Sequence, residues 1–313
     1  MPHLRRIAAG LTCLTALTTV AALAVPPAAG GSPGSHAPLA MCDGPAPHVT
    51  GFGDAAAPIL GWRENLVFDG RGRMWVSSSI ASEVTGYDAA GQRVATVHID
   101  SPGGLAVTPD GEVVVVTGAL VTAARSEIYA FDPDDDAPAP RLVATLPAGK
   151  NGLAVDPDGN MYTTGLFAPT VTKVRPDGSV DHAWSDAAAI GGTNGIAIRD
   201  NTAYLSATLA ADTVIYEMPL SNPAAARPHV HTRLPEVPRA LDDLAVTDDA
   251  IYAAGLTGGE IIRVDRRTGA SCVVVSGIPG PTSVRVAEHF GRFGAGDLFV
   301  TAIDGQIRHV ALG

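Results

Sequence analysis

A phrase that recurs six times is the feature that most constrains this chain. Each copy joins a short apolar run to a turn and a second apolar run, as in NGLAVDPDGNMYTTG from Asn151. The copies begin at Glu64, Gly103, Asn151, Asn194, Asp242 and Thr282. Their spacing of roughly 40 to 48 residues is typical of four-stranded propeller blades and too long for ankyrin or tetratricopeptide repeats. The repeat therefore predicts an all-β fold, a six-bladed β-propeller.

The third copy shows the expected strands most clearly. Residues 153–155 form a short apolar run, residues 156–160 carry the Pro and Gly of a tight turn, and residues 161–164 form the return strand. A third strand is expected over residues 171–174, and the PDGS turn after it should lead into an outermost fourth strand. Each blade is therefore predicted to be an antiparallel meander.

The two ends of the chain are expected to close the ring together. The stretch PHVTGFGDAAAPILGW precedes the first copy and has no blade of its own, whereas the last copy ends after QIRHVAL. An N-terminal strand that completes the sixth blade would pair otherwise open strand edges. We therefore expect one propeller domain over residues 42–313.

Composition fits a globular, turn-rich protein and excludes some partners. The chain has 313 residues, of which 46% are hydrophobic, 35 are Gly and 24 are Pro. Its net charge is −11, and it contains no basic cluster or ladder of stacking aromatic residues. Nucleic acid and acidic membrane surfaces are therefore not expected as partners, whereas cations would be attracted.

The first residues have the pattern of a targeting segment. Arg5 and Arg6 precede an apolar run over residues 7–25, and an A-x-A pattern ends at Ala24. This pattern predicts a secretory signal peptide over residues 1–24 and a secreted, extracellular protein. The alternative is an uncleaved signal anchor, because the apolar run approaches membrane-spanning length.

A flexible leader is expected next, over residues 25–41, because this segment is rich in Pro, Gly, Ala and Ser.

Of the three cysteines, Cys13 lies in the predicted signal peptide, so Cys42 and Cys272 remain in the mature chain. Two cysteines in an exported chain commonly form a disulfide. Two unpaired thiols are the alternative, since sequence does not give the distance between their Cα atoms.

The first position of the repeated phrase is a candidate metal site. A residue at the start of the innermost strand of a propeller blade faces the central channel, so equivalent positions converge on one axis. Four of these positions, Glu64, Asn151, Asn194 and Asp242, carry side-chain oxygens that suit Ca²⁺ or another hard divalent cation. Ordinary turn chemistry is the alternative for Asn-Gly and Asp-Asp, but it gives no reason for Glu64.

The ordered set of copies resembles the SMP-30/gluconolactonase/LRE family of six-bladed propellers, over about residues 42–313. Glu opens the first copy, Asn the third and fourth, and Asp the fifth. The resemblance implies that Glu64, Asn151, Asn194 and Asp242 hold a divalent ion at the floor of an active-site funnel.

The resemblance also implies a catalytic role for Asp242, as general base or nucleophile. An attacking water would need a base, and by position Asp242 is the nearest candidate and Asp243 the reserve. Asn65 and Asp243 would lie just behind the ion, where paraoxonase-like members hold a deeper ion.

One departure from the family bears on the substrate. Sugar lactonases of this family have an arginine two residues before the asparagine of the third blade, where this chain has Gly149. The departure argues against sugar-acid lactones. The sequence thus predicts a metal-dependent hydrolase that acts on a small-molecule lactone or ester. A secreted, non-catalytic propeller that binds a ligand or protein, with a structural ion, is the alternative.

Overall fold

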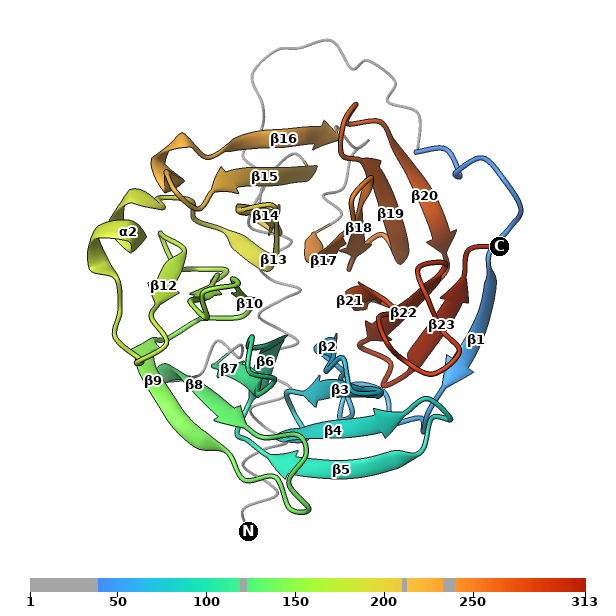
Figure 1. Ribbon diagram of the computed structural model, residues 1–313. Coiled ribbons are helices and arrows are strands. Elements are labelled where there is room, and N and C mark those ends of the chain that lie inside the picture. Colours follow the sequence, from blue (N-terminus) through green and yellow to red (C-terminus); the bar gives the residue numbers. More distant parts are fainter. Residues whose placement is uncertain (1–38, 119–122, 210–212, 233–239) are drawn as a thin grey trace.

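Six small antiparallel sheets form a closed ring in the computed structural model, which describes residues 39–118, 123–209, 213–232 and 240–313 (Figure 1). The six-bladed β-propeller predicted from the repeat is therefore confirmed. The predicted signal peptide, and the leader up to residue 38, lie outside the described residues. Among the described helices, none is long and apolar enough to cross a bilayer.

The first three blades follow the repeat order. Blade 1 contains β2 (Asn65–Phe68), β3 (Arg73–Ser78), β4 (Glu83–Asp88) and β5 (Arg93–His98). Blade 2 contains β6 (Pro102–Val107), β7 (Val113–Thr117), β8 (Arg125–Phe131) and β9 (Arg141–Pro147). Blade 3 contains β10 (Leu153–Val155), β11 (Met161–Thr163), β12 (Thr172–Val174) and the helix α2 (His182–Ala187).

The last three blades complete the ring. Blade 4 contains β13 (Thr193–Arg199), β14 (Thr202–Ala207), β15 (Thr213–Pro219), the 3-10 helix η1 (Pro223–Ala225) and β16 (Arg227–Thr232). Blade 5 contains β17 (Leu241–Val246), β18 (Ala250–Gly255), β19 (Glu260–Asp265) and β20 (Ser271–Ser276). Blade 6 contains β21 (Pro281–Val286), β22 (Asp297–Ala302), β23 (Ile307–Ala311) and β1 (His48–Phe52).

The first strand of every blade lies innermost, around the axis of the ring (Figure 1). We call the face where these inner strands begin the entry face, and the face where they end the exit face. The hydrophobic core lies between neighbouring blades. Trp75 and Val84 of blade 1, for example, pack with Val115 and Phe131 of blade 2, and all four are buried.

Blade 3 differs from the prediction of a fourth, outermost strand, which is wrong. After the PDGS turn, Val180 makes only an isolated bridge to Val174, and α2 follows. Asp181 caps this helix, because its carboxylate accepts a hydrogen bond from the backbone N–H of Trp184. The segment that follows the cap is rich in Ala and lacks the β-branched alternation of the other outer strands, so its local sequence favours the helix.

The ring closes as expected from the chain ends. β1 pairs antiparallel with β23, with His48 opposite Ala311 and Phe52 opposite Ile307. Phe52 then packs against Phe290, Phe293 and Phe299 of blade 6, with ring centroids 4.9 to 6.0 Å apart. An aromatic cluster thus joins the N-terminal strand to the last blade.

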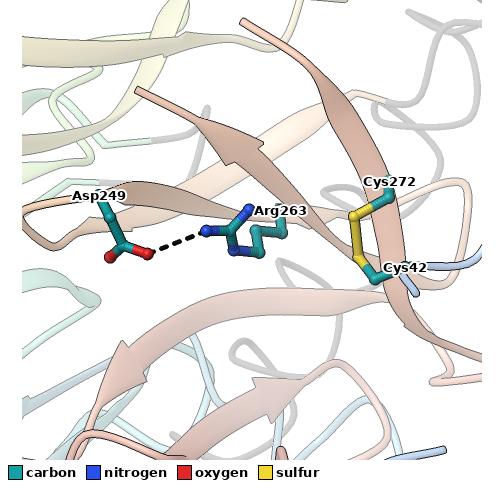
Figure 2. The surroundings of a disulfide bond; sticks show 4 residues. All are labelled: Cys42, Asp249, Arg263 and Cys272. Carbon is teal, nitrogen blue, oxygen red and sulfur yellow. Dashed lines mark hydrogen bonds and ion pairs between the residues drawn. A yellow bond between two sulfur atoms is a disulfide. The ribbon is translucent and has the colours of Figure 1, made fainter. Parts of the chain in front are cut away.

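A disulfide adds a second connection between the N-terminal segment and the ring. Cys42 and Cys272 are bonded, with Cα atoms 4.9 Å apart, so the predicted pairing is confirmed (Figure 2). Just before it, Ala40 accepts a hydrogen bond from the backbone N–H of Val273, and Met41 bridges Val273 in parallel. The N-terminal segment is therefore held along the outer edge of blade 5 before it enters blade 6.

Loss of this disulfide should destabilise the protein substantially. The bond spans a sequence separation of 230 residues, and a constraint on so long a loop removes much entropy from the unfolded chain. We expect the double variant Cys42→Ser/Cys272→Ser to lose about 4 kcal/mol in its free energy of unfolding, measured by urea denaturation. Reduced wild-type protein should match the variant; a reduced protein as stable as the oxidised one would contradict the expectation.

Candidate metal centre

β-Bulges at the entry ends of the inner strands explain how consecutive residues reach the axis. In a regular strand, successive side chains point to opposite faces. The pairing register shifts in β17 between Leu241 and Leu244, and similar shifts occur at the starts of β6, β13 and β21. The extra residue of a bulge re-aims its neighbours. Asp242 and Asp243 can therefore both contact residues across the channel.

The four predicted ligand residues lie together in one layer at the entry end. The Asn151 Nδ2 donates to Glu64 Oε1 over 3.0 Å, and Asn194 Nδ2 donates to Asp242 Oδ1 over 2.6 Å. The carboxylates of Glu64 and Asp242 are close enough for mutual repulsion to raise the pKa of Asp242. We call these four residues the entry layer.

Burial sets the electrostatics of the entry layer. Glu64 and Asp242 are only 6% and 4% exposed. Desolvation raises the pKa of Glu64, although its hydrogen bond from Asn151 opposes the rise. The pKa of Asp242 lies well above its ordinary value, because burial and then the charges of Glu64 and Asp243 all disfavour the ionised form.

A second layer lies directly behind. Asp243 Oδ2 accepts from Asn65 Nδ2 over 2.8 Å, from Ser283 Oγ over 2.6 Å and from Arg285 Nη1 over 2.5 Å. Asn65 Oδ1 also faces Arg285, at 3.4 Å from Nη2. We call Asn65, Asp243, Ser283 and Arg285 the floor layer. The positive charge that faces Asn65 and Asp243 is thus the guanidinium of Arg285, at the depth where the resemblance implies a deeper ion.

Glycines at the second position of three copies let the inner strands approach closely. A Cβ on Gly152 would lie 2.2 Å from the carbonyl oxygen of Asn194, and one on Gly195 would lie 2.5 Å from the Cα of Asp243. Both distances are shorter than real Cβ contacts. Glycine is therefore required there to bring the residues of blades 4 and 5 to the axis.

Hydroxyl groups of the second strands hold the backbone of the next blade, which the sequence reasoning missed. Thr164 Oγ1 donates to the carbonyl oxygen of Asn194, and Ser206 Oγ donates to that of Asp242. Ser77 Oγ makes the equivalent bond to the Gly103 carbonyl over 2.7 Å. The signal was present in the sequence, because the return runs WVSS, YTTG and YLSA each carry a hydroxyl near their ends.

Trp62 is a further residue of this site that the sequence did not reveal. It is 8% exposed, and its indole N–H favours the ionised form of Glu64. The N–H makes no regular hydrogen bond with any described residue. A buried donor without a partner normally costs stability. The Glu64 carboxylate is therefore the acceptor to which the Trp62 N–H contributes.

The donor set of the entry layer fits a divalent cation. Two buried carboxylates repel one another, and no positively charged side chain contributes to the pKa of either. Within the described part of the chain, no group of three or more His, Cys, Asp and Glu side chains forms a metal site. The amide oxygens of Asn151 and Asn194 would therefore have to complete the coordination. Rotation of each amide about its terminal bond exchanges the oxygen and nitrogen positions, and Ca²⁺ accepts such a mixed oxygen set.

Lys150 lies beside the entry layer and gives a pH-dependent prediction. Its side chain is buried and Nζ donates to Thr172 Oγ1 over 2.7 Å. Burial lowers the pKa of its amine to about 8. Below that pH the folded protein carries a poorly solvated charge, and this cost disappears as the pH rises toward the unfolded-state pKa of about 10.4.

We therefore expect Lys150→Met to raise the melting temperature at pH 7 and to have little effect near pH 10. Thermal unfolding at both pH values measures this. The matched control is Lys173→Met, because Lys173 is partly exposed and lies 4.0 Å from Asp181. An equal gain at both pH values would show that packing, and not the charge, is responsible.

Comparisons with known proteins place the fold. No protein-family model matches the chain, and no curated protein matches its sequence. Among solved structures, a gluconolactonase from Xanthomonas campestris is similar, with a TM-score of 0.62, 18% identity, and coverage of 88% of this chain and 97% of that one. A luciferin-regenerating enzyme has a TM-score of 0.61 and 16% identity, and the match covers 85% of this chain and 95% of that one.

A protein of different chemistry shares the architecture. The virginiamycin B lyase of Staphylococcus aureus matches with a TM-score of 0.54 and 12% identity, over 80% of each chain. The ring alone therefore does not decide the reaction, which depends on the residues at its axis. The chain has the six-bladed propeller fold of gluconolactonase and luciferin-regenerating enzyme, in agreement with its resemblance to the SMP-30/gluconolactonase/LRE family.

Proposed function

We propose that this protein is a divalent-cation-dependent hydrolase that acts on a small lactone or ester at the entry layer. The observation that carries the proposal is the convergence of Glu64, Asn151, Asn194 and Asp242, with two buried carboxylates and no neutralising side chain. The gluconolactonase with the same fold supports this choice of reaction. The departure at Gly149 directs it to lactones or esters other than those of sugar acids.

The residues of the chain have distinct roles in this proposal. Glu64, Asn151, Asn194 and Asp242 would hold the cation, which when bound polarises the substrate carbonyl. Asp242 would accept the proton of the attacking water, because its carboxylate lies in the entry layer beside the proposed cation. Asp243 is poorly suited to that role, because Oδ2 already accepts from three donors. The buried indole N–H of Trp62 favours the ionised form of Glu64, the form that would hold the cation.

Hydrolysis of a panel of lactones and aryl esters, in calcium and in chelator, tests the function. We expect turnover that chelator abolishes and calcium restores, together with binding of one Ca²⁺ per chain by calorimetry. Asp249→Asn is the matched control, because Asp249 is an exposed acid paired with Arg263 (Figure 2). Turnover that is insensitive to chelator would overturn the cation requirement. Calcium binding without turnover of any substrate would instead favour a non-catalytic binding propeller.

We also propose that the protein is exported. The Cys42–Cys272 disulfide supports this, because such bonds persist in oxidising compartments. Mass spectrometry of the protein from culture medium should find a new N-terminus after Ala24. A chain that retains residues 1–24 in the cell membrane would instead indicate a signal anchor.

A further inference from the structure

A cavity lies on the other side of the floor layer. It has a volume of about 470 Å³ and is lined by the exit halves of all six inner strands. The fourth side chain of each repeat lines it, namely Val67, Ala106, Ala154, Ala197, Ala245 and Arg285. Four alanines at equivalent positions leave the space open. Its size is within the range of small-molecule pockets, which are roughly 300 to 1,000 Å³.

Most of the residues that line this cavity have apolar side chains, although polar backbone atoms and charged groups also reach its wall. Alanine, valine, leucine and isoleucine side chains make up its middle, and charged groups stand where the inner strands end. One pair at this mouth, Arg199 and Asp248, forms an ion pair. The apolar side chains of the inner strands can contact the apolar part of a ligand, and the charged groups can contact a polar end.

Arg285 supplies a polar group at the inner end of the cavity. Its Nη1 is saturated, because it donates to Asp243, to the Val284 carbonyl over 2.8 Å and to the Leu244 carbonyl over 3.0 Å. By contrast, Nη2 has only the long 3.4 Å contact to Asn65 Oδ1. The side chain lines the cavity and is 16% exposed. One edge of the guanidinium, Nη2 with Nε, thus remains available for an acceptor.

We infer that the exit-face cavity binds a small monocarboxylate with an apolar chain or ring. The carboxylate would accept from Nη2 and Nε of Arg285, a geometry that a planar guanidinium favours. The apolar part would pack against Ala154, Ala197 and Ala245. The cavity is separated from the entry layer by the floor layer, so this inference does not depend on the proposed function.

Calorimetric titration of the full-length protein with octanoate, in chelator, tests the inference. We expect saturable binding of one octanoate per chain, and an affinity that falls about fourfold for each methylene removed in the series to butanoate. Octan-1-ol, which lacks the carboxylate, should bind at least tenfold more weakly. The Arg285→Lys variant should also bind octanoate about tenfold more weakly, because lysine keeps the positive charge but lacks the planar guanidinium edge.

Variants that fill the cavity distinguish this site from the entry layer. Ala197→Leu should weaken octanoate binding at least tenfold, whereas Ala224→Leu adds the same volume at an exposed position and should leave binding unchanged. If Ala197→Leu does not fold, the smaller change Ala245→Val carries the test. Glu64→Gln should have no effect. Absence of saturable binding, or binding that survives the filling variants or is lost with Glu64→Gln, would overturn the inference.

Discussion

Replacement of Asp242 by Asn is expected to abolish hydrolysis. The same change should lower the melting temperature in calcium and raise it in chelator. The residue is both a proposed ligand and the proposed general base, so the turnover rate should fall at least about 100-fold. In saturating calcium the variant should melt below the wild type. The reason is that bound calcium raises the free energy of unfolding of the wild type by about 2.7 kcal/mol when calcium is at 100 times its dissociation constant. The variant does not gain this stabilisation.

In chelator the order should be the opposite. The pKa of Asp242 is raised in the folded protein, so its ionisation opposes folding at any pH above the ordinary value for an aspartate. The Asp242→Asn change removes that charge, and the variant should therefore melt above wild type at pH 7. The advantage should shrink as the pH falls toward 4, where the unfolded chain also binds the proton.

Thermal unfolding with calcium and with chelator, at pH 7 and pH 4.5, measures both effects. Glu64→Gln should behave in the same way, whereas Asp249→Asn should not respond to calcium. If Asp242→Asn lowers the melting temperature equally in calcium and in chelator, the entry layer is held by packing and does not bind a cation. Retained hydrolysis in Asp242→Asn would remove its role as base.

Loss of the Arg63 side chain should be the most destabilising single change at the ring closure. Arg63 is 2% exposed and connects three parts of the chain. Its Nε donates to the Gly305 carbonyl over 2.8 Å, Nη1 to the Tyr87 hydroxyl over 2.7 Å, and Nη2 to the Asp54 carbonyl over 2.8 Å. These partners belong to blade 6, blade 1 and the segment that follows the closing strand.

We expect Arg63→Met to lower the free energy of unfolding by about 3 kcal/mol, because the change leaves buried acceptors without a donor. Urea denaturation measures this. Arg93→Met is the matched control, since Arg93 also pairs with Asp54 but is 41% exposed, and it should cost less than about 1 kcal/mol. Equal losses from the two variants would mean that surface charge, and not the buried connection, stabilises the closure.

The fold could be predicted from sequence because its information is repeated. Six copies report the same blade, so a weak signal in any one of them is reinforced by the others. The prediction was wrong where one blade departs from the repeat. The outermost element of blade 3 is α2, and its local signal, a capping residue followed by an Ala-rich segment, was outweighed by the expectation of a fourth strand.

The candidate site could be predicted only as far as strand position defines it. The first residue of each copy indicated which side chains face the axis, and these four do lie together. The bulge at Asp242 and Asp243 depends on pairing with β18, which sequence alone does not give.

The role of Arg285 could not be predicted for a different reason. It occupies, in the degenerate sixth copy, a position that is Ala or Val in the other five, and its role emerges only when blades 5 and 6 meet.

The pairing of Asp243 with the guanidinium of Arg285 has a consequence when the calcium concentration changes. Unlike a bound ion, the guanidinium is part of the polypeptide, so no competing chelator can strip it and no foreign metal can replace it. Depletion of dissolved calcium would therefore leave the deeper charge of Asp243 compensated. Of the two layers, only the entry layer, where we propose a divalent cation, would then respond to the calcium concentration.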